Sequence, residues 1–219
     1  MMKEIFPGIF RSEKKILTKN LFPGFKSHSE ELVSEEGIEY RVWDPSHSKP
    51  AAAIAKGLKN LPIKKGTKIL YLGIANGNTA TFFSDIIGIE GIIYGVEISE
   101  RSIQDVNPIA VKRKNIIPIL ANAKLPEKYS WVERVDVLYQ DVATSDQSEI
   151  LIRNAKLFLK KNGFAIMAVK SRSIDVTKKP EEVYKKELEK LKTFFEIIEK
   201  IRLDPFEKDH LFAVMRKMK

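Results

Sequence analysis

A short apolar segment that leads into two glycines constrains the fold of this 219-residue chain more than any other feature. Residues 69–72 are apolar, Gly73 and Gly77 follow four residues apart, and residues 78–87 have a helix-like pattern. Glycines let the backbone approach a ligand closely, and the first turn of a helix offers unpaired N–H groups. The pattern is typical of nucleotide-type cofactor sites in open α/β sheets. A purely structural turn fits it as well, because the full Gly-x-Gly-x-x-Gly spacing is absent.

The next predicted strand supports the cofactor interpretation. Residues 92–96 are an apolar run that ends at Glu97, about 20 residues after the glycines. An acidic side chain at that spacing suits hydrogen bonding to ribose hydroxyls.

From residue 68 onward, predicted strands alternate with predicted helices. The strands are expected at residues 68–73, 91–97, 115–120, 135–141, 164–170, 195–203 and 210–216, and the helices at 79–88, 100–113, 147–160 and 180–194. Pro108 is expected to bend or shorten the second helix. The alternation predicts a mostly parallel, doubly wound sheet. The last two strands, separated by little more than the Asp204-Pro205 turn, are expected to form an antiparallel hairpin. That order resembles the methyltransferases that use S-adenosylmethionine, whereas dinucleotide dehydrogenases usually lack the hairpin.

The first 48 residues differ from the rest and predict a small antiparallel β domain. Short strands are expected at residues 5–10, 16–18 and 39–43, between turn signals such as Pro7-Gly8 and Pro23-Gly24. A helix over residues 51–61 then leads into the larger sheet. We therefore divide the chain into an N-terminal domain, residues 1–48, and an α/β domain, residues 49–219.

Composition narrows the classes of function. The chain has no cysteine, which excludes disulfides, thiolate catalysis and Cys-ligated zinc. The net charge of +9 raises the odds of a polyanionic partner such as nucleic acid, although thermophile proteins are also rich in lysine. No apolar run approaches the ~18 residues of a membrane span, so neither a membrane nor a secreted location is expected.

Two polar residues follow apolar strands, at the carboxyl ends where open α/β sheets bind their ligands, and a third begins the last strand. Asp141 is either a functional acid or the cap of the next helix. Lys170 follows an entirely apolar run, and a partly desolvated lysine can orient or deprotonate a hydroxyl; the alternative is a surface lysine. His210 begins the last strand, either as a functional group or as a hydrogen-bonded edge residue. His28 and His47 are interpreted as surface or turn residues.

Taken together, several segments resemble fibrillarin, and specifically the archaeal fibrillarin-like 2′-O-methyltransferases. The resemblance extends from about residue 16 to the C-terminus, and its segments are residues 39–43, 48–49, 71–75, 94–97, 115–120, 136–143, 168–178 and 203–210. The segment Ala-Val-Lys-Ser-Arg-Ser-Ile-Asp-Val-Thr-Lys over residues 168–178 is the longest and most specific of them.

The resemblance implies a Rossmann-like methyltransferase fold with a seven-stranded sheet and a small N-terminal β domain. It implies S-adenosylmethionine as cofactor and ribose 2′-hydroxyls of rRNA and tRNA as substrates. Targets would be chosen by a box C/D guide RNA, in a particle with a Nop-domain scaffold protein and a ribosomal-type protein that binds kink-turns. The expected location is the cytoplasm of an archaeal cell.

The resemblance also assigns the site residues. The catalytic group would be Lys49, Asp141, Lys170 and His210, with Asp141 holding Lys170, which acts as a base or stabilises a developing alkoxide. The cofactor would contact Gly73, Thr79, Ala80, Glu97, Ile98, Asn122, Ala123, Asp141, Val142, Ala143, Thr144 and Gln147. No ligand spacing suggests a metal, and none is expected.

The chain departs from the family pattern at five positions near these residues. They are Asn76 in place of a usual Ser, Asn78 in place of Thr, Asn122 in place of Asp, Pro50 in place of Leu and Thr144 in place of Gln. These changes bear on cofactor affinity more than on the fold. Asn78, Asn122 and Pro50 motivate an alternative, a catalytically weak or inactive subunit that joins the particle without methyl transfer. A nicotinamide-dependent oxidoreductase is the third candidate, against which the missing glycine pattern and the segment around Lys170 both count.

Overall fold

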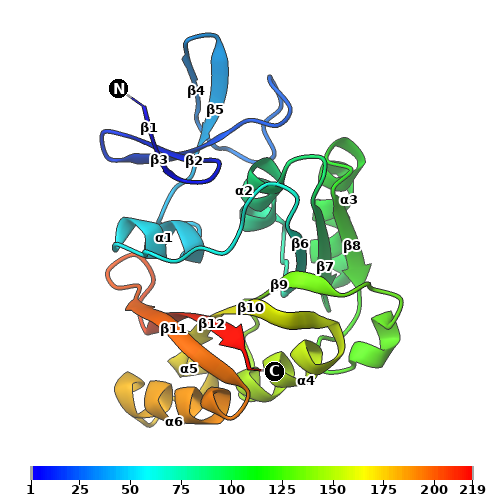
Figure 1. Ribbon diagram of the computed structural model, residues 1–219, viewed down its shortest axis with the longest axis vertical. Helices are drawn as coiled ribbons and strands as arrows, with labels where there is room; N and C mark the ends of the chain where they lie inside the picture. The colour runs from blue at the N-terminus through cyan, green and yellow to red at the C-terminus, as the bar shows by residue number, and fades with distance from the viewer. Residues whose placement is uncertain (1, 219) are drawn as a thin grey trace.

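The computed structural model describes residues 2–218, which form two β-sheets (Figure 1). The first is a five-stranded antiparallel sheet of order β1-β2-β3-β5-β4. Its strands are β1 (Lys3–Phe6), β2 (Ile9–Ser12), β3 (Lys15–Lys19), β4 (Leu32–Glu35) and β5 (Ile38–Val42). The sequence predicted only three strands here. The Pro7-Gly8 turn divides the first of them into a hairpin, and β4, whose four residues are Leu-Val-Ser-Glu, was not predicted.

The second sheet has seven strands in the order β11-β12-β10-β9-β6-β7-β8. They are β6 (Lys68–Leu72), β7 (Ile92–Glu97), β8 (Ile116–Leu120), β9 (Val135–Gln140), β10 (Leu159–Lys170), β11 (Phe195–Arg202) and β12 (His210–Lys217). The first five are parallel to one another, and β12 runs antiparallel to both β10 and β11. The predicted fold class, a mostly parallel seven-stranded sheet with a C-terminal hairpin and an antiparallel N-terminal sheet, is confirmed.

The helices connect these strands. They are α1 (Lys49–Ala55), α2 (Asn78–Ile87), α3 (Glu100–Lys112), α4 (Gln147–Phe158), α5 (Ser171–Ile174) and α6 (Pro180–Lys192), with a 3₁₀ turn η1 (Pro126–Tyr129). The prediction of a helix over residues 51–61 was wrong at both ends. The helix begins at Lys49, and it ends just before Gly57, whose φ of +95° an α-helix cannot continue. The helix α3 is not shortened at Pro108: it continues to Lys112, and Val106 and Ile109 are buried on either side of the proline.

Alternation along the strands divides the large sheet into two buried faces. On β6, Ile69 and Tyr71 belong to the apolar cluster under α1, α2 and α3. Leu70 and Leu72 belong to the cluster under α4, α6 and η1. Because both faces are covered by helices, the ends of the strands form the open edge of the sheet, where a ligand can reach the backbone.

A buried ionic network joins the N-terminal sheet to the α/β layer. Asp85 of α2 lies between Arg41 of β5 and Arg113, the residue after α3, at 2.7 Å and 2.6 Å, and all three side chains are fully buried. Thr18 of β3 donates a further hydrogen bond to Asp85. Burial lowers the pKa of Arg113, an effect that the charge of Asp85 opposes. The network fixes the small sheet above α2 (Figure 1). The domain boundary after residue 48 lies between β5 and α1 and stays a prediction.

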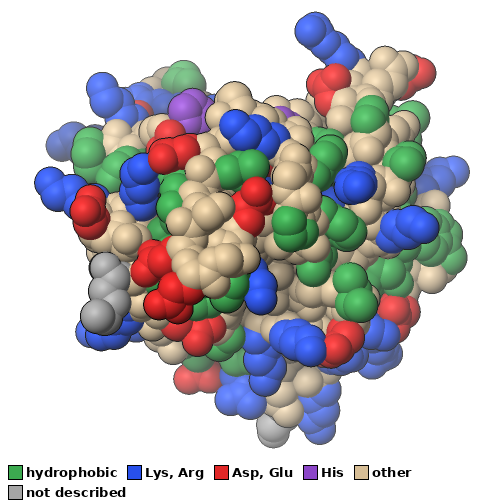
Figure 2. Space-filling model, turned by 90° about the horizontal axis from the view of Figure 1, so that it is seen from above, with side chains coloured by type: hydrophobic (Ala, Val, Ile, Leu, Met, Phe, Trp, Pro, Cys, Tyr) green, Lys and Arg blue, Asp and Glu red, His purple; other side chains and the backbone are tan. Residues whose placement is uncertain are grey.

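Figure 2 shows lysines and arginines spread over one face, with acidic side chains among them. Within residues 2–218, no helix combines the length and apolar character needed to cross a membrane.

Candidate active site

The site is built where the strand order of the large sheet reverses, between the neighbouring strands β6 and β9. There the N–H of Asp141 donates to the carbonyl of Leu72 at 2.9 Å, which places the ends of the two strands side by side. Gly73 has φ +80°, and a Cβ at this position would lie 2.5 Å from the carbonyl oxygen of Asp141. Only glycine permits this approach, which leaves an open crevice at the strand ends.

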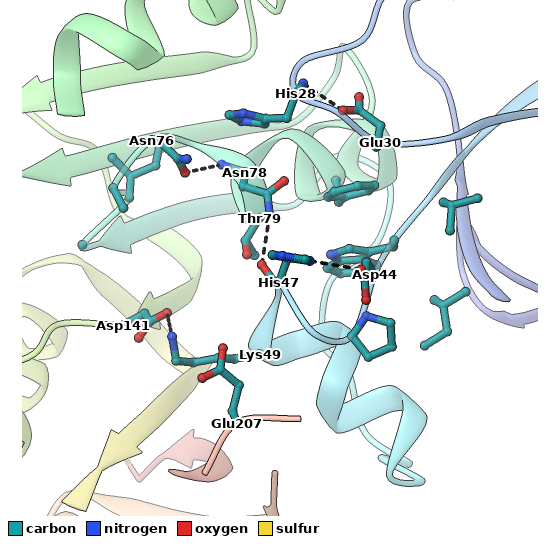
Figure 3. A pocket seen from close by; sticks show the side chains of 18 of the residues that line it. His28, Glu30, Asp44, His47, Lys49, Asn76, Asn78, Thr79, Asp141 and Glu207 are labelled. Atoms are coloured by element: carbon teal, nitrogen blue, oxygen red, sulfur yellow. Dashed lines mark hydrogen bonds and ion pairs between the residues drawn. The ribbon is translucent and has the colours of Figure 1, made fainter. Parts of the chain in front are cut away.

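The turn after Gly73 presents the start of α2 to this crevice. Gly77 adopts the left-handed conformation, with φ +81°, and precedes the first helical residue. The Asn76 side chain accepts a hydrogen bond from the backbone N–H of Asn78 at 3.3 Å. Asn76, Asn78 and Thr79 all line the crevice (Figure 3). The helix start supplies N–H groups and a favourable dipole for an anionic or polar ligand group.

A cavity of about 960 Å³ extends from this crevice to the N-terminal sheet. All four residues predicted to be catalytic line it: Lys49, Asp141, Lys170 and His210. Its far wall is formed by residues of the N-terminal sheet and its loops, among them Lys15, His28 and Glu30. The cavity is therefore bounded by both sheets.

Lys49 lies at the start of α1, and its Nζ pairs with Oδ2 of Asp141 at 2.7 Å. Both side chains are largely buried, at 18% and 24% exposure. Pro50 does not displace Lys49, because it falls in the first turn of the helix, where its missing N–H would have no partner anyway. The expectation that Asp141 holds Lys170 was wrong: the ion pairs of residues 2–218 join Asp141 to Lys49 and not to Lys170.

Two side-chain contacts hold the start of α1 against the start of α2. Asn78 donates from Nδ2 to the carbonyl of His47 at 3.0 Å. The hydroxyls of Ser48 and Thr79 lie 3.0 Å apart, and this bond is buried. Asn78, where the family usually has a threonine, thus connects the glycine turn to the segment that places Lys49.

Lys170 ends β10 with its side chain exposed toward the cavity. Its backbone is fixed by the amide of the fully buried Gln147. The N–H of Lys170 donates to Oε1 of Gln147 at 3.2 Å, and Nε2 of Gln147 donates to the carbonyls of Thr144, at 2.9 Å, and Lys170, at 3.4 Å. Gln147 therefore contacts Lys170 directly, while its predicted cofactor contact stays a prediction.

His210 begins β12, opposite Lys170 in the antiparallel register of β10 and β12. Its Nδ1 lies 2.7 Å from the carbonyl oxygen of Lys208. Because a carbonyl only accepts, Nδ1 bears the proton and Nε2 is left as an acceptor. Burial lowers the pKa of His210, and the positive charge of Lys49 acts in the same direction. The ring is therefore neutral at pH 7.

Glu97 braces the glycine turn from the neighbouring strand β7. Its carboxylate accepts hydrogen bonds from the N–H of Ala75 at 3.0 Å and of Ser99 at 2.9 Å. A carboxylate has about four acceptor positions, so two remain for a ligand's hydroxyls. Ile98, next to it, is 66% exposed.

Comparison with known proteins decides the family. The sequence profile described as Fibrillarin matches residues 1–219. The chain belongs to the fibrillarin family. A fibrillarin-like rRNA/tRNA 2′-O-methyltransferase of Thermococcus gammatolerans is 51% identical, with 98% of each chain covered.

Two solved fibrillarin structures have the same fold. Aeropyrum pernix fibrillarin in complex with natively bound S-adenosyl-L-methionine is 45% identical with a TM-score of 0.88, covering 98% of this chain and 99% of that one. Fibrillarin in a fibrillarin/Nop5p complex is 39% identical with a TM-score of 0.91, covering 99% of this chain and 100% of the other.

Only some of the residues predicted to contact the cofactor of this fibrillarin line the cavity. Gly73, Thr79, Asp141, Val142 and Ala143 line the cavity. Glu97, Ile98, Asn122, Ala123, Thr144 and Gln147 lie outside the cavity lining, and Ala80 is completely buried. Asn122 follows β8, and its Oδ1 accepts from the N–H of Lys124 at 2.9 Å. The assignment of these residues to the cofactor stays a prediction.

Sequence reasoning missed several residues that line the cavity of this fibrillarin. Tyr71 is fully buried beneath it, and burial raises its pKa, as does the charge of Asp141 to a smaller extent. His28, interpreted as a surface or turn residue, lies in the wall, and burial lowers its pKa. Glu207 lies on the opposite side (Figure 3). Tyr71 and Glu207 lie close in the sequence to Gly73 and His210, but no sequence pattern indicates which side chains face the cavity. Among residues 2–218, no cluster of three His, Asp or Glu side chains is arranged to hold a metal.

Proposed function

We propose that this fibrillarin transfers a methyl group from S-adenosylmethionine to ribose 2′-hydroxyls of rRNA and tRNA. One observation carries the proposal: four side chains from four separate segments, Lys49, Asp141, Lys170 and His210, line one cavity beside the glycine turn. The names of the relatives support it, since the Thermococcus protein is a fibrillarin-like rRNA/tRNA 2′-O-methyltransferase.

The residues present fit S-adenosylmethionine. The cavity lining includes Gly73 and the start of α2, where Asn78 and Thr79 lie, so backbone N–H groups of the glycine turn are accessible to a ligand. Glu97, with two acceptor positions free, would hold the ribose hydroxyls of the cofactor, and Asn122 and Ile98 would contact its adenine. The bound cofactor supplies an electrophilic methyl group. The Aeropyrum fibrillarin, with its natively bound cofactor, supports the same assignment.

The chain's own groups then orient and deprotonate the sugar hydroxyl. His210 presents a neutral Nε2, which accepts the proton as the hydroxyl oxygen attacks. Lys170, with its backbone fixed by Gln147, places its ammonium where it stabilises negative charge on that oxygen. The Lys49–Asp141 pair holds Asp141 in place at the mouth of the crevice. Positioning in line contributes most of the remaining rate enhancement.

The scaffold partner is supported by the solved complex, and the other partners are part of the proposal. The fibrillarin in the solved complex assembles with Nop5p, so we assign this chain a Nop-domain scaffold partner. A box C/D guide RNA would choose the target nucleotide, and a ribosomal-type protein that binds kink-turns would complete the particle. The net charge of +9 suits contact with RNA phosphates.

The test is reconstitution of the particle from this chain, a Nop5-type scaffold, a kink-turn protein and a box C/D guide RNA. With labelled S-adenosylmethionine, one ribose opposite the guide is expected to gain a methyl group. A guide shifted by one nucleotide should shift the label by one position, and the chain alone should methylate poorly. Label that ignores the guide, or efficient sequence-specific methylation by the chain alone, would contradict the proposal.

The alternative is an inactive subunit that joins the particle without catalysis, as suggested by Asn78, Asn122 and Pro50. Calorimetry of the isolated chain with S-adenosylmethionine separates the two. Heat of binding, together with labelled RNA in the particle, supports the enzyme. An assembled particle that gives neither identifies the inactive subunit.

A further inference from the structure

Two of the proposed catalytic residues, Lys170 and His210, lie on neighbouring strands whose backbones position them. Lys170 is the last residue of β10, His210 is the first residue of β12, and the two are paired in the antiparallel register. Beyond this pair the strands separate, since Lys170 leads into α5 and His210 is preceded by an exposed loop. The pairing of β10 with β12 therefore holds Lys170 and His210 only on the side of the sheet, and the segments beyond them need other contacts.

Contacts between Ser171, Arg172 and Asp209 connect the two segments beyond Lys170 and His210. The N–H and the hydroxyl of Ser171 both donate to the carbonyl of Asp209, at 3.1 Å and 3.2 Å. Nε of Arg172 donates to Oδ2 of Asp209 at 3.0 Å. Nη1 of Arg172 also donates to the carbonyl of Val176 at 3.0 Å, which anchors the arginine on its own loop. The residues directly after Lys170 are thus bonded to the residue directly before His210.

Asp209 is held in a backbone conformation that a free loop would disfavour. Its φ is +58°, in the left-handed region that non-glycine residues adopt rarely, although aspartate is among the more tolerant. Asp209 separates Lys208 from His210, and its turn brings the Lys208 carbonyl to within 2.7 Å of the His210 Nδ1. If Asp209 relaxed to an extended conformation, this bond to the ring would break.

We propose that Arg172 and Asp209 are positioning residues for methyl transfer, which hold Lys170 and His210 in their working arrangement. The inference rests on the proposed function, because it assigns these residues to that reaction. Neither residue lines the cavity, so they act through the groups that they hold. Their ion pair is partly exposed, at 49% and 30%, so it is expected to contribute little to global stability.

The consequence is measurable at the His210 ring. The charged groups around the ring are Lys49 from α1, Asp141 after β9 and Glu207 from the preceding loop. Burial is the largest influence and lowers the pKa of His210. Once Asp209 is released, the ring gains solvent, which raises its pKa, and loses the hydrogen bond to Lys208, which lowers it. Because burial is the larger influence, the pKa is expected to rise toward the ordinary 6.5.

The experiment compares Arg172→Ala, Asp209→Ala and Asp209→Asn with the wild-type chain. NMR titration of the imidazole signals, with His210 assigned from a His210→Gln variant, needs neither RNA nor methyl transfer. We expect the His210 midpoint to rise in the two alanine variants. In the reconstituted particle their kcat should fall about tenfold, with the Kd for S-adenosylmethionine unchanged within about twofold. Asp209→Asn, which tolerates the left-handed backbone and still accepts a hydrogen bond, should retain most of the rate.

Arg202→Ala is the matched control. Arg202 is similarly exposed, at 41%, and also pairs with a nearby aspartate, Asp204, but neither residue lines the cavity or bonds to the residues that flank Lys170. It should leave both the His210 midpoint and kcat at the wild-type values. A wild-type His210 midpoint in Arg172→Ala and Asp209→Ala would overturn the proposal, whatever their activity. An equal loss of kcat in Arg202→Ala and in the two test variants would also overturn the proposal. If the wild-type particle itself fails to methylate, the proposed function fails. The titration then still decides whether Arg172 and Asp209 hold the His210 ring in place.

Discussion

Nζ of Lys49 lies 2.7 Å from Oδ2 of Asp141, although 92 residues separate them in the sequence. The pair joins α1, which follows the N-terminal sheet, to the end of β9 at the centre of the large sheet. It therefore closes one side of the cavity and ties the position of α1 to the crevice. The bond is partly shielded from water, which strengthens it relative to an exposed pair.

The pair predicts non-additive effects of substitution. Asp141→Asn and Lys49→Met should each reduce methyl transfer by about a hundredfold or more, because each leaves the other group without its partner at the reacting centre. The double variant should be only slightly worse than either single variant. Single-turnover rates in the reconstituted particle measure this, with circular dichroism to confirm that each variant is folded. Strictly additive losses would show that the two residues act independently.

Gly73 is predicted to be irreplaceable because of its neighbour and not only because of its φ. Gly73→Ala would place Cβ 2.5 Å from the carbonyl oxygen of Asp141, so the strand ends must separate. Gly66 has nearly the same φ, +78°, but a Cβ there would meet no atom within 4 Å, and Gly66→Ala is the matched control. Both should lose about 1–2 kcal/mol of stability from the left-handed backbone.

Only Gly73→Ala should also lose S-adenosylmethionine affinity, by at least about tenfold, and methyl transfer with it. Calorimetry with the cofactor and chemical unfolding of both variants separate the two effects. Equal cofactor affinity in the two variants would show that the crevice at Gly73 is not where the cofactor binds.

Much of the fold and part of the site follow from the sequence alone. The strand ends at Gly73, Asp141 and Lys170 were predicted to meet because the carboxyl ends of parallel strands share one edge of a sheet. The C-terminal hairpin followed from the lack of a helix between the last two strands. These inferences need only local patterns and the handedness rules of α/β folds.

What the sequence did not reveal depends on contacts across long separations. Asp141 was expected to hold Lys170, yet it pairs with Lys49, because α1 turns its first residue toward the sheet. The burial of Arg41 and Asp85 was also missed, since charged residues in a basic chain are expected at the surface. Nothing local distinguishes a buried charge from a solvated one.

His210 predicts an acid limit to activity. Burial lowers its pKa, so the neutral ring with a free Nε2 persists below the ordinary value of 6.5. The rate of methyl transfer should therefore fall with a midpoint below pH 6.5, as the ring gains a proton. In His210→Gln the rate should be lower throughout, and this limb should disappear. A limb that persists in the variant would belong to another group.

The lowered pKa of His210 also makes stability depend on pH, because the unfolded chain binds the proton at a higher pH than the folded chain. In the unfolded chain the ring is protonated near pH 6.5, whereas the folded chain accepts the proton only at lower pH. The free energy of unfolding should therefore fall as the pH drops below 6.5, by at most about 1.4 kcal/mol per pH unit for each such histidine. His28, whose pKa burial also lowers, contributes to this slope, so the stability profile reports both rings while the rate profile reports His210.

Asp85 is predicted to be essential for stability, because its carboxylate lies between two buried arginines. It accepts hydrogen bonds from Arg41, Arg113, Thr18 and the N–H of Leu21. Asp85→Asn keeps the shape but removes the charge that pairs with Arg113, and it leaves Arg41 with Glu30 as its acidic partner. The loss should be about 3–5 kcal/mol of unfolding free energy. Guanidinium chloride unfolding, followed by fluorescence and circular dichroism, measures it.

The exposed pair of Lys65 and Glu90, at 2.8 Å, provides the comparison for Asp85. Glu90→Gln removes one acidic charge from an ion pair of similar length, with side chains 72% and 60% exposed, and should cost no more than about 1 kcal/mol. Both variants remove one acidic charge, so the difference between their losses of unfolding free energy measures the effect of burial. If Asp85→Asn were as mild as Glu90→Gln, the ionic network would not be what fixes the N-terminal sheet on α2, and the apolar contacts around Trp43 and Phe82 would have to do so.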